Sequence, residues 1–325
     1  MERLKTTFAG LNLKNPFIVS SSGLTDSAEK NRQLEQAGAG AIVLKSLFEE
    51  QIMWQAAHHA AETDYPEAGD YLQGYLRAHY LDEYTRLVKE TKKVCTIPVI
   101  ASINCYTDRE WEEYAKVIEQ AGADAIELNL MALQASVDYQ YGSFEQRHID
   151  ILKHVREQVH VPVIVKLGSN LTNPVKLIAQ LQANGAAAVV LFNRFYHTDI
   201  DIDKLEYTAG HVLSHESELA NSLRWIGIAS GAVGRIDYAA SGGVTSGRDI
   251  VKSILVGASA VEVCSALYKE GAKAIYPMLE AMRDWMALHG YETVGQFKGM
   301  MAAKDPEQVN AFERTQFMKY FGEKK

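Results

Sequence analysis

The sequence predicts an α/β fold, and within that class a (β/α)8 TIM barrel with long active-site loops and a C-terminal helical extension. Three observations indicate it. One phrase, a helix end followed by glycine and a short β-branched strand, recurs along the chain. Further strand patterns lie between its copies, and amphipathic helical patterns separate the strands. Regular alternation of strands and helices is typical of a parallel sheet, and eight such units close into a barrel.

The recurring phrase sets the spacing of the units. Each copy contains a glycine, which suits the left-handed position that ends a helix. The strand after each glycine is continuously apolar, as expected for parallel strands that are buried on both faces. Successive glycines are separated by about two βα units. The copies are QAGAGAIVLK (36–45), QAGADAIELN (120–129), QANGAAAVVLFN (182–193) and LVGASAVEVC (255–264).

Other strand candidates interleave with these copies and bring the total to eight. Helical patterns such as AEKNRQLEQ, REWEEYAKVIEQ, VKLIAQLQ and RDIVKSIL lie between the strands. The alternative, a doubly wound open sheet, predicts a GxGxxG turn after the first strand, and the sequence has none. The additional strands are FIVSSSG (17–23), PVIASIN (98–104), VPVIVKLG (161–168) and IDYAASGG (236–243).

We expect one barrel domain over residues 1–325, because no low-complexity linker interrupts the chain. Segments 48–80 and 195–215 are longer than ordinary connections in such units, and long segments in a compact domain are often lids or binding loops. Residues 292–325 are predicted to form a C-terminal extension that ends in a helix. An amphipathic helix over 142–155 is expected to pack on the barrel.

Composition limits the class of protein. The 325 residues are 47% hydrophobic, with a net charge of −8 and no basic run, which argues against nucleic-acid binding. No apolar run approaches the ~18 residues of a membrane span, and the N-terminal residues lack the apolar region of a signal peptide. Three cysteines without CxxC spacing favour a reduced compartment. We therefore expect a soluble, cytoplasmic protein.

No spacing of residues predicts a metal site. His58 and His59 are adjacent, so on a helix they would point about 100° apart, a poor arrangement for two ligands of one ion. The acidic residues of DIDID (199–203) would share one face of a strand. They could bind a cation, but a solvated edge of the long 195–215 segment is the more common arrangement.

Polar side chains follow the predicted strands, where barrels place their chemistry. Two lysines within apolar strands are unusual, because burying an unpaired charge is unfavourable. Each residue alone can be a structural hydrogen-bonding group, but the set at one rim favours a ligand site. In strand order the set is Ser20, Ser21, Ser22, Gly23, Lys45, Ser46, Ser102, Asn104, Asn129, Lys166, Asn193, Arg194, Ser241, Gly242, Gly243, Cys264 and Ser265.

The last two units indicate a phosphate site. SGGVTSGRDI places Gly242 and Gly243 at a strand end before a helix, and VEVCSALYKEG repeats that arrangement one unit later. Exposed backbone N–H groups at such turns bind phosphate, and the helix dipole assists them. The turns after the seventh and eighth strands are the usual phosphate site of this fold.

These residues resemble those of the dihydroorotate dehydrogenases, soluble class 1-like flavin enzymes of pyrimidine biosynthesis, over about residues 4–300. The similar stretches include LKNPFIVSSSG, VLKS, IELNL, VPVIVKLG, ASGGVTSGRDIVKSILVGASAV and SALYKEG. The resemblance implies bound FMN, and it implies that Asn129 and Asn193 face the substrate. The residues that it places around FMN are Ser22, Gly23, Lys45, Asn104, Asn129 and Lys166, with Gly242, Gly243, Ser265 and Ala266 at the phosphate.

The residue types suit flavin chemistry. Hydride enters flavin at N5 and leaves negative charge near N1 and C2=O, which a fixed lysine such as Lys166 can stabilise. Asparagine amides both donate to and accept from a flat pyrimidine ring.

The substrate half of the pattern differs from the family. There the strand continues as Asn-Leu-Ser-Cys-Pro-Asn in the form with a cysteine base, whereas this chain reads NLMALQ. Ala132 occupies the base position and cannot accept a proton. Gln134 replaces the second substrate asparagine, Arg194 stands where a small hydroxyl residue is expected, and Glu67 replaces an asparagine before the third strand.

Three explanations fit these differences. In the first, Ser136 is the base, since related enzymes use a serine with a water path or an anionic neighbour; an ordinary turn serine is the alternative. In the second, the substrate differs, with Glu67, Gln134 and Arg194 contacting it and Arg194 pairing with a carboxylate. In the third, catalysis is lost while FMN is retained.

We therefore predict an FMN-dependent oxidoreductase that transfers hydride between a dihydropyrimidine-type C–C bond and flavin, nominally dihydroorotate to orotate. Ser136 and Lys45 are the candidate catalytic residues. A pyrimidine-like substrate, a soluble electron acceptor and a homodimer are expected, with no nucleic acid, membrane or metal. The alternatives are an FMN-binding protein with another substrate or no dehydrogenase activity, and a flavin-free phosphate-binding barrel.

Overall fold

The structure is a computed structural model that describes residues 2–48, 68–104 and 111–313. Its centre is a closed barrel of eight parallel strands, in which each strand pairs with its neighbours and the β4–β6 pairing completes the ring. All eight predicted strands are confirmed. They are β3 (Phe17–Val19), β4 (Ala41–Val43), β6 (Val99–Asn104), β7 (Ala125–Leu130), β8 (Val163–Gly168), β9 (Ala188–Asn193), β12 (Asp237–Ser241) and β13 (Ala260–Val263). A short strand, β5 (Leu47–Phe48), extends the edge of β6.

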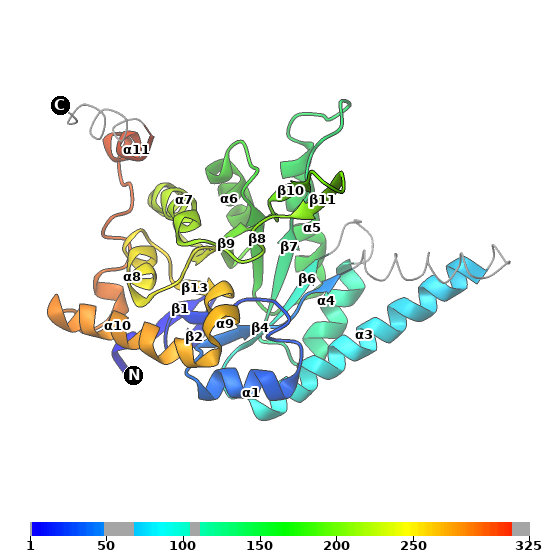
Figure 1. Cartoon of the computed structure of the whole chain (residues 1–325), viewed down its shortest axis with the longest axis horizontal. Helices are drawn as coiled ribbons and strands as arrows, with labels where there is room; N and C mark the ends of the chain where they lie inside the picture. The colour runs from blue at the N-terminus through cyan, green and yellow to red at the C-terminus, as the bar shows by residue number, and fades with distance from the viewer. Residues whose placement is uncertain (1, 49–67, 105–110, 314–325) are drawn as a thin grey trace.

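Helices surround the barrel (Figure 1). The predicted helical patterns all form, and α5 buries the apolar face of its sequence against the barrel. The helices are α1 (Ala28–Gln36), α3 (Ala68–Val94), α4 (Trp111–Gln120), α5 (Ser143–Gln158), α6 (Pro174–Ala183), α7 (Leu219–Ala232), α8 (Gly247–Leu255), α9 (Ser265–Glu270), α10 (Ile275–Leu288) and α11 (Pro306–Glu313).

The recurring glycines have the conformation that the sequence predicts. Gly38, Gly122, Gly185 and Gly257 all have positive φ, between +92° and +116°. Each lies between the end of one helix and the start of the next strand. A residue with a β-carbon is strained there, so the repeated phrase encodes the repeated αβ turn.

The barrel interior is a separate apolar layer beneath the site. It is formed by inward-facing side chains such as Ile18, Val43 and Ile164. A hairpin of β1 (Thr6–Phe8) and β2 (Leu11–Leu13) adds Phe8 and Leu13 to this layer. The β1–β2 hairpin packs at the amino ends of the barrel strands and closes that end of the barrel. The polar strand termini lie at the opposite end, where the strands finish.

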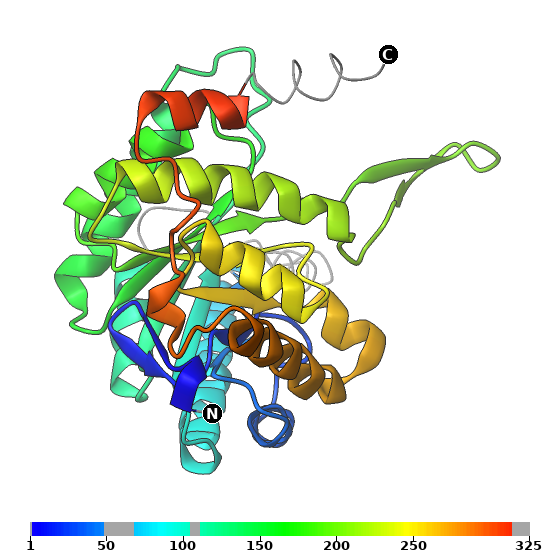
Figure 2. The ribbon, with the colours of Figure 1, turned by 90° about the vertical axis from the view of Figure 1, so that its left-hand side faces the viewer.

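The two long segments contain regular structure that sequence reasoning missed. Residues 68–80, predicted as part of a loop, belong to α3, which extends away from the barrel (Figure 1). Glycines and aromatic residues obscure the helical period there, although one glycine weakens a long helix by only about 1 kcal/mol. The 195–215 segment contains β10 (Thr198–Asp201) and β11 (Glu206–Ala209), an antiparallel hairpin that projects from the body (Figure 2).

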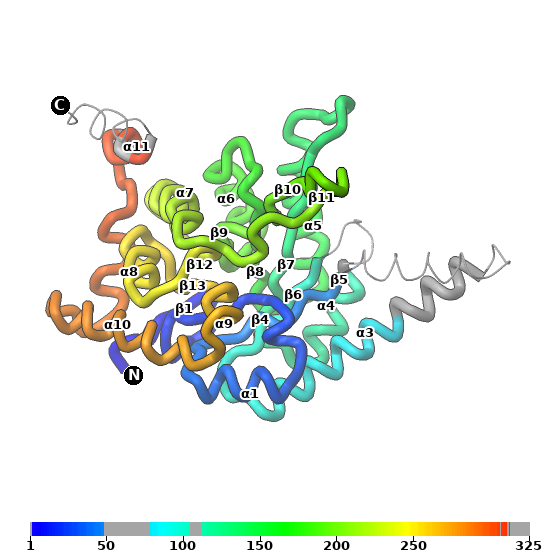
Figure 3. Tube along the Cα trace, in the orientation of Figure 1, coloured from blue at the N-terminus to red at the C-terminus, as the bar shows by residue number. Residues whose placement is uncertain are grey.

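The described part of the C-terminal extension packs on the outer helices. The N–H groups of Gly299, Met301 and Ala303 donate to the carbonyls of Ile254, Leu255 and Gly227. The chain therefore runs along α8 and α7 before it reaches α11 (Figure 3).

Within the described ranges, no helix combines the length and the hydropathy needed to cross a bilayer. His58, His59, Glu67 and Cys105 lie outside the described residues, so their predicted environments are not part of the structure.

Candidate active site

A cavity of about 160 Å³ opens where the strands end, and we call it the Lys166 cavity. Its walls come from β3, β8, β9, β12 and β13, which are consecutive in the barrel. It gathers serine hydroxyls, one lysine, one carboxyl group and the glycine turn after β12. Its lining residues are Ser20, Ser21, Lys166, Phe192, Asn193, Arg194, Tyr196, Val212, Ser214, Ser241, Gly242, Gly243, Val244, Glu262, Cys264 and Ser265.

Lys166 is buried, as predicted, and is held by two neighbouring strands. Its Nζ lies 2.5 Å from Glu262 Oε2 and 2.9 Å from Ser20 Oγ. The Ser20 hydroxyl donates to the same Glu262 oxygen over 2.9 Å. Burial alone lowers the pKa of Lys166, but the nearby carboxyl groups of Glu127 and Glu262 outweigh burial and raise it. The lysine is therefore a fixed cation at the floor of the cavity.

The turn after β12 has the geometry that a glycine pair permits. Gly242 and Gly243 have φ of +85° and +72°. A β-carbon on Gly242 would meet open space, whereas one on Gly243 would collide with the backbone of His215 and Leu219. The Gly243 N–H points to the Ser214 hydroxyl at 3.2 Å.

Two serines complete this corner of the cavity. Ser265 is the first residue of α9. Its Oγ accepts one hydrogen bond from the Ser214 N–H at 2.8 Å and a second from the Ser214 hydroxyl at 2.9 Å. The corner therefore contains a backbone N–H and two hydroxyl groups, which are the groups that bind phosphate in proteins. The backbone of the buried residue Ala266 follows immediately.

The two predicted substrate asparagines lie together. Asn193 Nδ2 donates to Asn129 Oδ1 over 2.6 Å, and Asn193 Oδ1 accepts from the Arg194 N–H over 2.7 Å. These bonds fix the orientation of the amides at the ends of β7 and β9. Asn104, at the end of β6, is also buried but is not part of this pair.

Arg194 has protein partners on the 210–218 segment. Its Nε lies 2.7 Å from Glu218 Oε2, and its other nitrogens donate to the carbonyls of Val212 and His211. The guanidinium therefore anchors the segment that carries Ser214. Because Arg194 also lines the Lys166 cavity, it borders the space available to a ligand.

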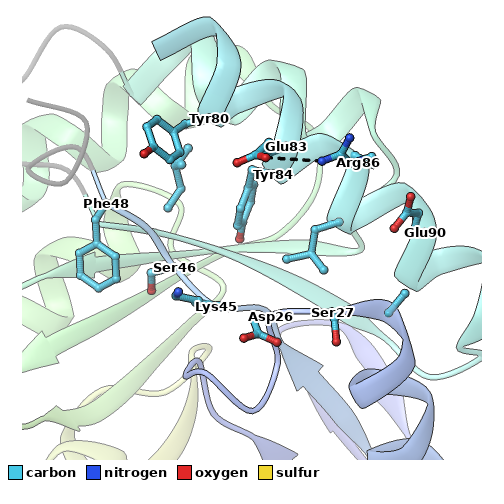
Figure 4. Close-up of a pocket in the computed structure, with 13 residues that line it drawn as sticks. Asp26, Ser27, Lys45, Ser46, Phe48, Tyr80, Glu83, Tyr84, Arg86 and Glu90 are labelled. Atoms are coloured by element: carbon cyan, nitrogen blue, oxygen red, sulfur yellow. Dashed lines mark ion pairs between the residues drawn. The ribbon is translucent and has the colours of Figure 1, made fainter. Parts of the chain in front are cut away.

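Lys45 differs from the prediction that it is buried. It is exposed, and it follows β4 rather than lying inside it. The apolar run AIVL ends before Lys45, so the side chain leaves the barrel wall. It lines a second cavity of about 370 Å³ between the rim and α3 (Figure 4). Across that cavity lie Tyr80, Glu83, Tyr84 and Arg86 of α3.

A chain of hydroxyl groups separates the two cavities. Ser21 Oγ lies 3.0 Å from Ser46 Oγ, which lies 2.7 Å from Ser102 Oγ. Ser22 and Gly23 continue from Ser21. The Ser22 hydroxyl accepts the Leu24 N–H, and a β-carbon on Gly23 would lie 3.0 Å from the Tyr268 hydroxyl oxygen. Neither residue lines the Lys166 cavity.

The loop after β7 carries the remaining candidates. Gln134 and Ser136 are exposed, and the Ser136 hydroxyl accepts the Asp138 N–H over 3.1 Å. Asn170 donates from Nδ2 to the Ala132 carbonyl over 2.9 Å, which ties the loop to the end of β8. The structure thus places Ser136 in an exposed turn and not among the residues that line the Lys166 cavity.

Sequence reasoning missed Glu262 and Ser214. Glu262 is an acid inside the apolar strand VEVC, the same signal that made Lys166 noticeable, and it could have been found that way. Ser214 stands in the irregular segment between β11 and α7, where no periodicity indicates which side chain turns inward. Its role follows only from its contacts with Gly243 and Ser265.

The residue types that line the Lys166 cavity suit the flavin that the resemblance implies. The glycine turn leaves room at Gly242, where a β-carbon would meet no atom within 4 Å. Lys166 supplies a cation on one side, and the Ser214–Ser265 corner supplies phosphate-binding groups on the other. Among the described residues, no group of three His, Cys, Asp or Glu is arranged to hold a metal ion, and Asp201 of the DIDID stretch instead accepts N–H groups of its own turn.

Comparison with known proteins places these features in a family context. The family model described as Dihydroorotate dehydrogenase matches residues 3–286. The chain is 28% identical to the dihydroorotate dehydrogenase B (NAD(+)) catalytic subunit of Thermoplasma volcanium, over 92% of this chain and 99% of that protein. It is 32% identical to the protein of the same name from Methanocella arvoryzae, over 80% of this chain and 86% of that protein.

Proposed function

The chain belongs to the dihydroorotate dehydrogenase family, and we propose that it is an FMN-dependent oxidoreductase acting on a CH–CH bond of a dihydropyrimidine-type ring. Dihydroorotate, oxidised to orotate, is the nominal substrate. The observation that carries the proposal is the placement of Lys166 and the Gly242–Gly243 turn in one cavity at the carboxyl end of the barrel. These are the two features that binding flavin and stabilising its charge require.

The phosphate of FMN is assigned to the corner built by Gly242, Gly243, Ser265 and Ala266. Their backbone N–H groups are the proposed donors, and the hydroxyl groups of Ser214 and Ser265 supplement them. Ser214 Oγ accepts the Gly243 N–H and donates to Ser265 Oγ, and a bound phosphate would accept from these two donors instead.

The ring system is assigned to the space between Lys166 and the strand ends, with Ser22, Gly23, Lys45, Asn104 and Asn129 around it. When bound, FMN supplies a two-electron acceptor for hydride. Lys166 would supply positive charge for the negative charge that develops on the reduced ring, to the extent that its partner Glu262 does not offset it. Lys45 is proposed to act from the rim, where it is exposed.

The substrate is assigned to the side of the Asn129–Asn193 pair. The amides orient a flat ring that carries both donors and acceptors, and Gln134 and Arg194 are proposed to contact its remaining polar groups. Oxidation of the C–C bond removes a hydride from one carbon and a proton from the other. Ser136 is the proposed base, which would pass that proton on through a water path or to an anionic neighbour.

A second candidate is an FMN-binding protein of this fold with another substrate or without dehydrogenase activity. Ala132 at the usual base position favours it, and so do the partners that Arg194 and Ser136 already have. Arg194 can still pair with a carboxylate of a different ligand, because its guanidinium has donors beyond those it uses for the 210–218 segment.

We further propose a homodimer in the cytoplasm with a soluble electron acceptor. The sparse cysteines support a reducing compartment, and Cys95 and Cys264 are free in the described part of the chain. Several relatives are named as NAD(+) enzymes, so NAD(+) and fumarate are the first acceptors to assay.

The test is anaerobic mixing of the purified protein with dihydroorotate and related dihydropyrimidines. A bound flavin is expected to absorb near ~450 nm and to lose that absorbance on reduction. Bleaching by dihydroorotate supports the nominal substrate, and bleaching only by another dihydropyrimidine supports the second candidate. A protein that purifies without flavin and does not bind added FMN contradicts the proposal.

A further inference from the structure

Three ionisable side chains meet at the floor of the Lys166 cavity. Lys166 lies 2.5 Å from Glu262 Oε2 and 3.6 Å from Glu127 Oε1. The exposed fractions of the three residues are 5%, 2% and 0%. Two carboxyl groups therefore lie beside one ammonium group, and all three side chains are buried.

This group cannot carry a full charge on every member without an energetic penalty. Two buried carboxylates with one cation leave a net negative charge in a medium of low polarity, which is unfavourable. Both oxygens of Glu127 and Oε1 of Glu262 lack a hydrogen-bond donor in the structure. One proton on either carboxyl group would remove the excess charge.

The position of that proton follows from the surroundings. Burial and the Glu262 carboxylate raise the pKa of Glu127 well above its ordinary value. Burial also opposes ionisation of Glu262, but the neighbouring Lys166 cation outweighs burial and lowers the pKa of Glu262. Tyr84 and Cys264 are the other titratable groups nearby, and burial raises the pKa of each, so neither adds a charge.

We propose that Glu262 is a charge-balancing residue for bound FMN: it neutralises Lys166, while Glu127 holds a proton behind it, so the flavin meets a neutral ion pair. This inference rests on the proposed FMN site. Reduced flavin carries negative charge, which a free lysine would stabilise strongly and a neutralised lysine stabilises less. The pair therefore keeps the reduction potential of the flavin low, which favours passing electrons onward.

Infrared spectroscopy tests the proton without any flavin. The FMN-free protein should show the carbonyl stretch of a protonated, buried carboxyl group, and Glu127→Gln should abolish it. Asp249→Asn, which removes another buried carboxylate that lies outside the cavity, is the matched control and should leave the band unchanged. A wild-type protein without the band, or a band that survives Glu127→Gln, overturns the assignment of the proton.

The midpoint potential of bound FMN tests the charge. Glu127→Gln should leave the potential unchanged, because it replaces a neutral acid by a neutral amide. In Glu262→Gln the proton should leave Glu127, whose carboxylate then pairs with Lys166 from 3.6 Å. The potential should therefore shift to a more positive value, but by less than when both glutamates are replaced.

A double variant with Glu127→Gln and Glu262→Gln removes both possible counter-ions of Lys166. It should bind reduced FMN at least about tenfold more tightly relative to oxidised FMN, which is ~30 mV for a two-electron couple. A double variant with the wild-type potential, or a Glu127→Gln shift as large as that of the double variant, overturns the proposal. A protein that binds no FMN instead contradicts the proposed function, and the infrared test still decides where the proton lies.

Discussion

At the residue scale, Ser136 has two separable roles. Its hydroxyl caps a turn by accepting the Asp138 N–H, and we propose that it also accepts the substrate proton. Ser136→Ala removes both roles, whereas Ser136→Asn keeps the cap, since asparagine supports the same turn, but provides no base. If Ser136 is the base, both variants should slow anaerobic flavin reduction by dihydroorotate about 100-fold or more.

The pair of variants separates the alternatives in single-turnover measurements. Slow reduction in Ser136→Ala with a normal rate in Ser136→Asn would mean that the serine only shapes the loop. Normal rates in both would assign proton removal to another group. Flavin content, measured by absorbance, should be unchanged in both variants, because Ser136 does not line the Lys166 cavity.

The residues of the candidate site were predictable where charge and apolar surroundings conflict in the sequence. Lys166 sits between apolar neighbours in a strand, and the structure buries it. Lys45 looked similar, but its strand ends before it and the side chain is exposed. Ser214 could not be found, because its position depends on the 210–218 segment, which Arg194 holds through contacts distant in sequence.

At the element scale, the start of α8 depends on Asp249. Its Oδ2 accepts the N–H groups of Thr245 and Ser246 at 3.2 and 3.0 Å, and its Oδ1 lies 2.8 Å from Lys252 Nζ. The cap fixes the residues that follow the Gly242–Gly243 turn. We expect Asp249→Asn to lower the free energy of unfolding by about 1–2 kcal/mol at pH 7, measured by urea denaturation.

The pH dependence of this effect has a definite sign. Burial opposes ionisation of Asp249, but its hydrogen bonds to Lys252 and Ser246 outweigh burial and hold the pKa below the ordinary value of 3.8. The unfolded chain then binds more protons, so the contribution of Asp249 is complete above that value and is lost as the pH falls through the folded pKa.

The difference between wild type and Asp249→Asn should therefore shrink from pH 7 to pH 3. Asp284→Asn is the control, since that carboxylate is largely exposed on α10 and should change stability by less than about 0.5 kcal/mol. An Asp249→Asn effect that is constant with pH, or equal to that of the control, would mean that the cap contributes through its shape and not its charge.

Elements that repeat were predictable, and elements that occur once were not. The αβ turns share one glycine phrase, so one recognised copy identifies the others. The β1–β2 hairpin has no second copy, although the two-residue turn Ala9–Gly10, with φ of 52° and 79°, is a known hairpin type. The β10–β11 hairpin is exposed on both faces and lacks the alternation of a half-buried strand.

At the scale of the whole molecule, the number of predicted strands in the sequence was enough to predict that the barrel closes. Eight strands with helical connections leave no sheet edge once the first pairs with the last, as β3 and β13 do. The position of the site at the carboxyl ends follows from the same topology. The number of strands could not predict that the rim is divided into two cavities. Side chains from different strands, such as Ser21 and Ser46, form the boundary between them.

The projecting β10–β11 hairpin is where we predict that the homodimer forms. Ile200 and Tyr207 are cross-strand partners, and their exposed fractions are 56% and 84%; Ile202 and Leu205 are exposed as well. Large apolar residues gathered on one projection favour a protein interface, and a second copy would supply the same residues across a twofold axis.

In a twofold dimer each substitution is present twice, so Ile200→Asp should raise the dimer dissociation constant by tenfold or more in sedimentation experiments. Leu288→Asp is the matched control, because Leu288 is 83% exposed on α10 and away from the hairpin, and it should leave the dimer intact. A monomeric wild-type protein would contradict the dimer itself. A dimer that Leu288→Asp weakens as much as Ile200→Asp would place the interface elsewhere on the barrel.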